Sequence, residues 1–243
     1  MKGNNIKTSS KLDFLEPGQI LFEDNHIIII NKLPSQIVQG DKTGDRTLAD
    51  LVKDYIKVRY KKPGEVFLGV VHRLDRPVSG CVIFARTSKA LTRLNQLIKD
   101  RGVQKTYWAV VKNHPLNESA SLTDYLLRDE AKNKSFVVKE GTKNSQLAKL
   151  SYSLKAASDN YFLLVVDLET GRHHQIRAQL ANMGCPIKGD LKYGYARSNA
   201  DGSIHLHARK LQFVHPVTQN EILITAPPPK DPVWDYFQQP IKG

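Results

Sequence analysis

Cysteines and long hydrophobic segments are scarce in this 243-residue sequence. The two cysteines, Cys81 and Cys185, lie far apart, which fits neither a disulfide scaffold nor a zinc-ligand pair. Apolar runs such as Ile27 to Ile30 are far shorter than the roughly 18 residues that a membrane-spanning helix needs. The sequence therefore argues against a secreted disulfide-rich protein and against an integral membrane protein.

Several functional motifs are also missing. The first residues, Met1 to Lys7, are polar and do not lead into the apolar segment of a secretory signal, so we expect a cytoplasmic protein. No glycine-rich nucleotide-binding loop is present, and we expect no organic cofactor. The closest histidine groupings, 173–174 and 205–207, lack the spacing of a zinc motif, so we expect no metal.

Acidic residues are outnumbered by basic ones. The chain has 36 Lys and Arg against 24 Asp and Glu, giving a formal net charge of +12. Such an excess favours a polyanionic partner, although a basic protein without one is the alternative interpretation. With 40% hydrophobic residues, the chain is long enough to bury one sizeable core.

The hydrophobic pattern predicts one α+β domain over residues 17–243, after a polar and disordered leader at 1–16. Strands outnumber helices and are mostly separated by short turns, which predicts a mixed, mainly antiparallel central sheet flanked by helices and loops. Predicted strands cover 19–22, 26–31, 67–71, 81–85, 104–111, 161–166, 211–214 and 221–225. Predicted helices cover 48–58, the stretch between Thr87 and Gly102, and the stretch after Gly171. Residues 112–149 are polar and weakly periodic, so hairpins or mobile fingers are expected there.

Asp75 is the first candidate for chemistry. It lies between Arg73 and Arg76 in a loop predicted at 72–80, directly after a buried strand. Nearby positive charge favours the ionised carboxylate, which keeps it usable as a nucleophile or a base. A surface salt bridge at the end of a strand is the alternative.

Two further segments carry candidate residues. Arg177 follows the turn at Gly171, one turn into a predicted helix, where partial burial requires an acidic partner. Asp75 is one candidate partner, and a structural pair with Glu169 or Asp190 is the alternative. In the strand 104–111, alternation places Tyr107 with Ala109 and Val111 on one face, opposite Trp108 and Val110. Tyr107 is suited either to stacking on a base or to closing the edge of a core.

Five short motifs, in this order, resemble those of the RluA-type pseudouridine synthases over roughly residues 18–230. They are His-Arg-Leu-Asp with Ser-Gly (72–75, 79–80), Lys-x-Tyr (105–107), Gly-Arg-x-His-Gln-Ile-Arg (171–177), Gly-Asp with Tyr-Gly (189–190, 193–194), and Leu-His-Ala with His-Pro (206–208, 215–216). Five motifs in order make chance similarity very unlikely, whereas one alone is weak.

The resemblance implies isomerisation of specific uridines in rRNA or tRNA, in which the C1′–N1 bond is cut, the uracil turns, and a C1′–C5 bond forms. It makes Asp75 the catalytic aspartate, Tyr107 the aromatic ring that stacks on the target uracil, Arg177 the partner of the aspartate, and Arg73 the side chain that fills the place of the flipped base. Flipping the base costs a few kcal/mol, which backbone binding by the positive surface offsets. The resemblance implies no metal or cofactor, and we expect a monomer. Attack on C1′, attack on C6 and a role as a base all remain open for Asp75.

The sequence departs from the family pattern in three places. Val78 replaces the usual threonine beside Ser79, and His173 stands where threonine is common. Many relatives also carry an N-terminal S4-type RNA-binding domain, which the residues before position 18 are too few to form. We therefore expect the catalytic domain and its 112–149 region to select the RNA.

Two alternative functions are a non-catalytic RNA-binding protein on the same fold and a glycosidase-like hydrolase. The hydrolase requires a second acid near Asp75.

Overall fold

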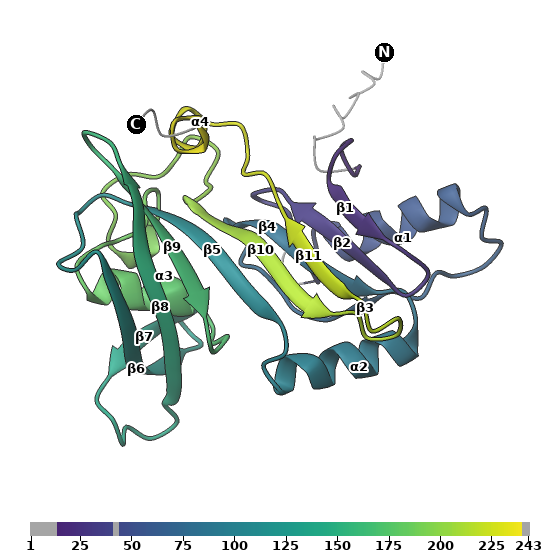
Figure 1. Ribbon diagram of the computed structural model, residues 1–243, viewed down its shortest axis with the longest axis horizontal. Coiled ribbons are helices and arrows are strands. Elements are labelled where there is room, and N and C mark those ends of the chain that lie inside the picture. The colour runs from purple at the N-terminus through teal and green to yellow at the C-terminus, as the bar shows by residue number, and fades with distance from the viewer. Residues whose placement is uncertain (1–13, 41–43, 240–243) are drawn as a thin grey trace, which may run out of the picture.

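A mixed sheet of eleven strands forms the centre of the protein in the computed structural model, which describes residues 14–40 and 44–239 (Figure 1). The strands are β1 (Ile20–Glu23), β2 (Ile27–Lys32), β3 (Gly69–Val70), β4 (Ser79–Ala85), β5 (Gln104–Val111), β6 (Ser119–Asp129), β7 (Lys134–Val138), β8 (Gln146–Ala157), β9 (Phe162–Leu168), β10 (Leu206–Val214) and β11 (Glu221–Thr225). Their order is β1-β2-β4-β10-β5-β9-β8-β6-β7, with β3 paired to β4 and β11 to β10. Of the strand pairs in the described residues, only β4 with β10 is parallel, which confirms the predicted α+β class.

Four helices flank the sheet: α1 (Leu48–Arg59), α2 (Ser88–Lys99), α3 (Gln175–Asn182) and α4 (Pro232–Gln238). The predicted start of α1 is confirmed, because Thr47 forms a capping box in which its side chain and that of Asp50 each accept from the other's backbone N–H. Thr87 caps α2 in a similar way by accepting from Ala90. Within the described ranges, no helix combines the length and the apolar character needed to cross a membrane.

The first half of the sheet is covered on both faces. Ile28 and Ile30 of β2 pack in the cluster around α1, whereas Ile27 and Ile29 pack in the cluster that contains residues of α2. A strand covered on both sides is apolar at every position instead of alternating, which explains the isoleucine run.

The alternation predicted for β5 is confirmed. Tyr107 packs against Ile176 of α3, on the face that also buries Ala109 and Val111. Trp108 lies on the opposite face and packs with Trp234 of α4. The two faces of β5 therefore pack against different helices, one against α3 and the other against α4.

Several predicted boundaries were wrong. Strand β3 has only two residues because β10 pairs with the same edge of β4 further along. As a result, β4 begins at Ser79 and the loop before it ends two residues earlier than predicted. Strand β10 begins at Leu206 instead of 211, and α4 after the prolines was not predicted. Most of the predicted leader, residues 1–13, lies outside the described residues.

The hairpin expected within 112–149 is present as β6 and β7, whose turn contains Asn133 in a left-handed conformation. Strand β6 also pairs along eight positions with β8, which in turn pairs with β9. This region therefore extends the central sheet and is joined to it by continuous backbone pairing.

Candidate active site

Asp75 lies in the loop between β3 and β4, and hydrogen bonds from outside the loop fix its backbone. The carbonyl of Arg76 accepts from Ser35 N at 2.9 Å and from Lys32 Nζ at 3.1 Å. On the other side, Ile204 N donates to the carbonyl of Pro77 at 3.1 Å. A loop fixed in this way presents its carboxylate in one orientation, as catalysis requires.

His72 joins the same loop to the sheet. Its Nε2 accepts a hydrogen bond of 3.1 Å from Ile83 N, at a point where the edge of β4 is not paired with another strand. Burial lowers the pKa of His72 well below its usual value, so the ring is neutral and able to accept. The histidine of the His-Arg-Leu-Asp motif thus replaces a missing strand partner.

Lys32 lies beneath the loop with its side chain fully buried. Burial lowers its pKa to about 7, while the negative charge of Asp75 opposes that shift. Its Nζ donates to the carbonyls of Leu33 and Arg76. The sequence analysis did not single out this lysine, which continues an apolar strand and has no motif of its own.

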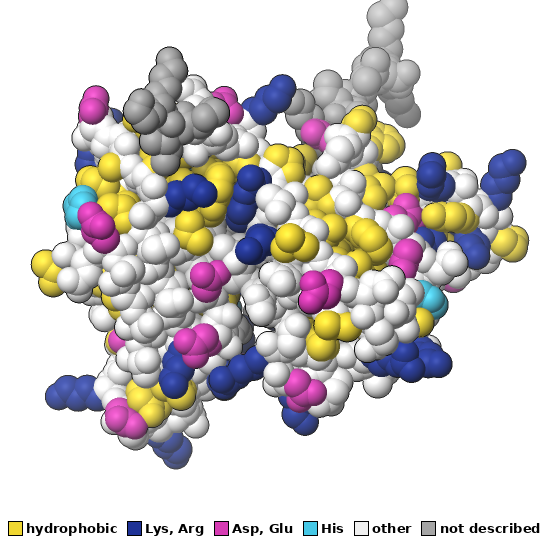
Figure 2. All heavy atoms as spheres, in the orientation of Figure 1, with side chains coloured by type: hydrophobic (Ala, Val, Ile, Leu, Met, Phe, Trp, Pro, Cys, Tyr) yellow, Lys and Arg dark blue, Asp and Glu magenta, His cyan; other side chains and the backbone are white. Residues whose placement is uncertain are grey.

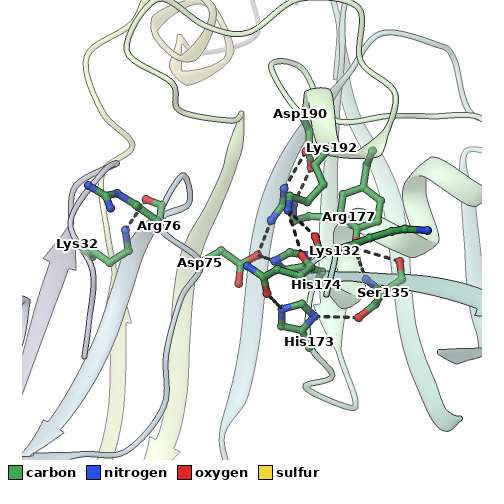
Figure 3. A network of polar contacts seen from close by, with 12 residues as sticks. Lys32, Asp75, Arg76, Lys132, Ser135, His173, His174, Arg177, Asp190 and Lys192 are labelled. Carbon is green, nitrogen blue, oxygen red and sulfur yellow. Dashed lines mark hydrogen bonds and ion pairs between the residues drawn. The ribbon is translucent and has the colours of Figure 1, made fainter. Parts of the chain in front are cut away.

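Arg177 contacts two carboxylates, as Figure 3 shows. Its Nη1 donates to Asp75 Oδ2 at 2.9 Å, which confirms the predicted partner. The bidentate pair, however, is formed with Asp190: Nε and Nη2 donate to its two oxygens at 2.7 and 2.8 Å. Asp190 therefore occupies two sides of the guanidinium, and one nitrogen remains for Asp75. Hydrogen bonds and charge from Asp190 raise the pKa of Arg177 against the opposing effect of burial.

His174 lies at the start of α3 and faces Asp75. Its Nε2 is 3.4 Å from Asp75 Oδ2, and its Nδ1 is 3.0 Å from the hydroxyl of Tyr193. The backbone of His174 is left-handed, with φ of 54°, whereas the turn was predicted to depend on Gly171. A left-handed non-glycine residue costs about 1–3 kcal/mol and is often found at functional sites. Burial, with a contribution from Arg177, lowers the pKa of His174 to about 3, so the ring is neutral at physiological pH.

Tyr107 lies on the same side of the sheet as α3 and is nearly buried. Burial, and next the charge of Asp75, raises the pKa of its hydroxyl, which keeps it protonated. Arg73 is exposed and makes no hydrogen bond or ion pair with any described residue. The structure therefore brings Asp75, Tyr107 and Arg177 together, and among the described residues it gives Arg73 no polar partner.

Lys105 shares the face of β5 that carries Tyr107, two residues away. It lies within electrostatic range of His72, and burial lowers its pKa. Among residues 14–40 and 44–239, nothing forms a hydrogen bond or ion pair with this half-buried amine. An unpaired cation with restricted access to water is costly, and an anionic ligand would relieve that cost.

Two site residues were visible in the motifs but had no assigned role. Asp190 appeared only as an alternative partner of Arg177, and Tyr193 only as part of the Tyr-Gly pair. The hydrolase alternative requires a second acid near Asp75, and Asp190 is the acid that the structure places there. It is 1% exposed and both of its oxygens accept from Arg177, so it is unsuited to activating a water.

Comparison with known proteins identifies the class that this site and fold represent. A model of the RNA pseudouridylate synthase family matches residues 26–182. The uncharacterized RNA pseudouridine synthase YhcT of Bacillus subtilis (strain 168) is 35% identical over 216 residues, covering 87% of this chain and 69% of the relative. Ribosomal large subunit pseudouridine synthase C of Buchnera aphidicola subsp. Acyrthosiphon pisum is 31% identical, covering 86% and 67%. The chain belongs to the RluA-type RNA pseudouridine synthases and is an isomerase that acts on RNA.

Solved structures agree on the fold. Human RNA pseudouridylate synthase domain containing 4 superposes with a TM-score of 0.75 at 23% identity, covering 90% of this chain and 91% of that one. Human RNA pseudouridylate synthase domain containing 1 gives 0.68 at 22% identity, covering 90% and 86%.

Proposed function

We propose that the protein isomerises uridines of ribosomal RNA, with tRNA as a second substrate class, and that Asp75 is its catalytic group. The observation that carries the assignment is the contact of 2.9 Å between Asp75 and Arg177, on the face of the sheet that presents Tyr107. A charged hydrogen bond keeps the carboxylate ionised and oriented. Relatives named for the large ribosomal subunit support rRNA as the substrate.

Each remaining site residue has a role in this proposal. Tyr107 stacks on the flipped uracil, since it lies within electrostatic range of Asp75 on the face of the sheet that carries α3. Arg73 fills the place that the base leaves, because it is exposed beside Asp75 and has no partner among the described residues. The protein acts on RNA in the cytoplasm as a monomer, without a metal or cofactor.

Recognition of RNA is assigned to the basic surface and to the sheet extension at 112–149. Figure 2 shows Lys and Arg side chains on both halves of one face, mixed with acidic and hydrophobic side chains. The formal net charge of +12 favours binding to a phosphate backbone, and it gives that binding a steep salt dependence.

The test is to map pseudouridines in the rRNA and tRNA of cells that lack the protein and then express wild type, Asp75→Asn, or Asp159→Asn. Asp159 is an exposed loop carboxylate and serves as the matched control. We expect Asp75→Asn to bind RNA but restore no modification, and Asp159→Asn to restore it fully. If Asp75→Asn restores modification, Asp75 is not the catalytic group. If cells that lack the protein show unchanged pseudouridine maps of rRNA and tRNA, neither RNA class is its substrate.

A further inference from the structure

Arg177 and His174 both contact the same oxygen of the Asp75 carboxylate. Arg177 Nη1 donates to Oδ2 at 2.9 Å, and His174 Nε2 lies 3.4 Å from that atom. In the described part of the chain, no residue donates to Oδ1. The two oxygens of Asp75 are therefore not equivalent: one faces the protein, and the other is left for a ligand.

The neutral His174 ring carries one proton, and its position decides whether the ring attracts or repels Asp75. If Nε2 carries the proton, it points a donor at Oδ2. If Nδ1 carries it, a lone pair on Nε2 faces a carboxylate, and two acceptors repel each other. The negative charge of Asp75 therefore favours the Nε2–H tautomer. A separation of 3.4 Å is long for a hydrogen bond, as catalytic contacts often are before substrate binds.

Tyr193 completes this arrangement. Its oxygen accepts from Ser135 N at 2.8 Å, and its single hydrogen can be donated either to His174 Nδ1 at 3.0 Å or to the Ser135 carbonyl at 3.1 Å. The two distances are nearly equal, so the tautomer of His174 selects between them. With Nε2 protonated, Nδ1 must accept, and the Tyr193 hydroxyl donates to it.

His173 fixes the plane of the His174 ring. The two rings stack with centroids 3.8 Å apart and an interplanar angle of 22°. His173 is itself hydrogen-bonded at both nitrogens to the β6–β7 hairpin, to Ser135 Oγ at 2.9 Å and to Asn133 Oδ1 at 3.2 Å. The hairpin thereby determines the orientation of a ring that touches Asp75.

We propose that His174 is a positioning residue that donates its Nε2–H to Asp75 Oδ2, with Tyr193 donating to its Nδ1, so that Asp75 presents Oδ1 to the uridine. The inference rests on the proposed role of Asp75. It extends that role by assigning the reacting oxygen and by connecting the hairpin to the catalytic loop.

The direct test is long-range ¹H–¹⁵N correlation NMR on the histidine side chains of the wild-type protein at neutral pH, with the His174 signals assigned by substitution. We expect Nε2 to show the protonated and Nδ1 the unprotonated ¹⁵N signature. In Asp75→Asn, which removes the charge, we expect the Nδ1–H form to become populated. A wild-type protein with protonated Nδ1 would overturn the proposal. This measurement needs no activity, so its outcome is independent of the proposed function.

A kinetic test separates positioning from simple packing. His174→Gln places an amide donor near the position of Nε2, whereas His174→Leu keeps comparable bulk without a donor. We expect the single-turnover rate to fall about ten- to a hundredfold in His174→Leu and to recover largely in His174→Gln, with RNA affinity unchanged in both. Equal loss in the two variants would assign the ring a structural role instead. Tyr193→Phe should lower the rate without weakening RNA binding, and an unchanged rate would contradict its part in the arrangement.

Discussion

Arg177 joins a buried carboxylate to a partly exposed one: it donates two hydrogen bonds to Asp190 and one to Asp75. Asp190 and Arg177 are 1% and 5% exposed, so their charges depend on each other. The bidentate pair fixes the plane of the guanidinium, and the remaining nitrogen then has a defined direction toward Asp75. Asp190 thus orients Asp75, the proposed catalytic carboxylate, without touching it.

Asp190→Asn should therefore impair both stability and catalysis. Breaking a buried pair leaves an uncompensated charge, and we expect a loss of about 3 kcal/mol in the free energy of unfolding. The rate should fall about a hundredfold because Arg177 is no longer aligned. Urea unfolding and single-turnover kinetics measure the two effects, with Asp159→Asn as the control. Wild-type kinetics in a folded Asp190→Asn protein would refute the orienting role.

Gly80 lies where β4 meets β10, and a side chain has no room there. Its φ is +114°, and an added Cβ would lie 2.3 Å from the carbonyl oxygen of Ala208. We expect Gly80→Ala to lower the unfolding free energy by roughly 3 kcal/mol or more, from backbone strain and steric overlap together. Gly141→Ala is the matched control, since Gly141 also has a positive φ of +82° but open space around it, and it should cost about 1 kcal/mol. Equal losses in the two variants would show that the contact with Ala208 is unimportant.

Acid should destabilise the protein below about pH 6.5. Burial lowers the pKa of six histidines: His72, His173, His174, His205, His207 and His215. The unfolded chain takes up protons on these rings near pH 6.5, whereas the folded protein does not, so stability is present above that pH and is lost as the pH falls.

Urea midpoints between pH 7.5 and 5 measure this effect. Each such ring contributes at most about 1.4 kcal/mol per pH unit. His207→Gln removes a fully buried ring whose pKa burial lowers to about 4, and it should reduce the slope by one proton. A midpoint that stays constant from pH 7.5 to 5 would contradict the prediction.

Lys105 should contribute to RNA binding and not to folding. Lys105→Met removes a half-buried cation that lacks a partner among the described residues, so the unfolding free energy should stay equal or rise. RNA affinity should fall, and the slope of log K against log salt should decrease by about 1 if the amine contacts a phosphate. Lys89→Met, which alters an exposed lysine of α2, should leave the slope unchanged. Filter binding over a salt series distinguishes the two, and an unchanged slope in Lys105→Met would exclude a phosphate contact.

Much of the fold followed from local patterns. The alternation in β5 and the cap at Thr47 are determined by neighbouring residues, so both were predictable. The length of β3 was not, because it depends on which strand occupies the edge of β4. A tight turn before α3 was expected at Gly171, whereas the residue with a left-handed backbone is His174, whose ring contacts Tyr193.

By itself, the sequence determined the composition, the basic charge, the mixed sheet and the motifs that place this chain among the pseudouridine synthases. Those properties follow from residue types and short spacings, which a linear chain already contains. Only the tertiary structure decided that Arg177 is shared between Asp190 and Asp75, and that His174 and Tyr193 face the same carboxylate. Partner choice among charged groups depends on which side chains the fold brings within hydrogen-bonding distance. Residues 75, 177 and 190 meet only when the loop before β4, helix α3 and the loop after α3 pack together.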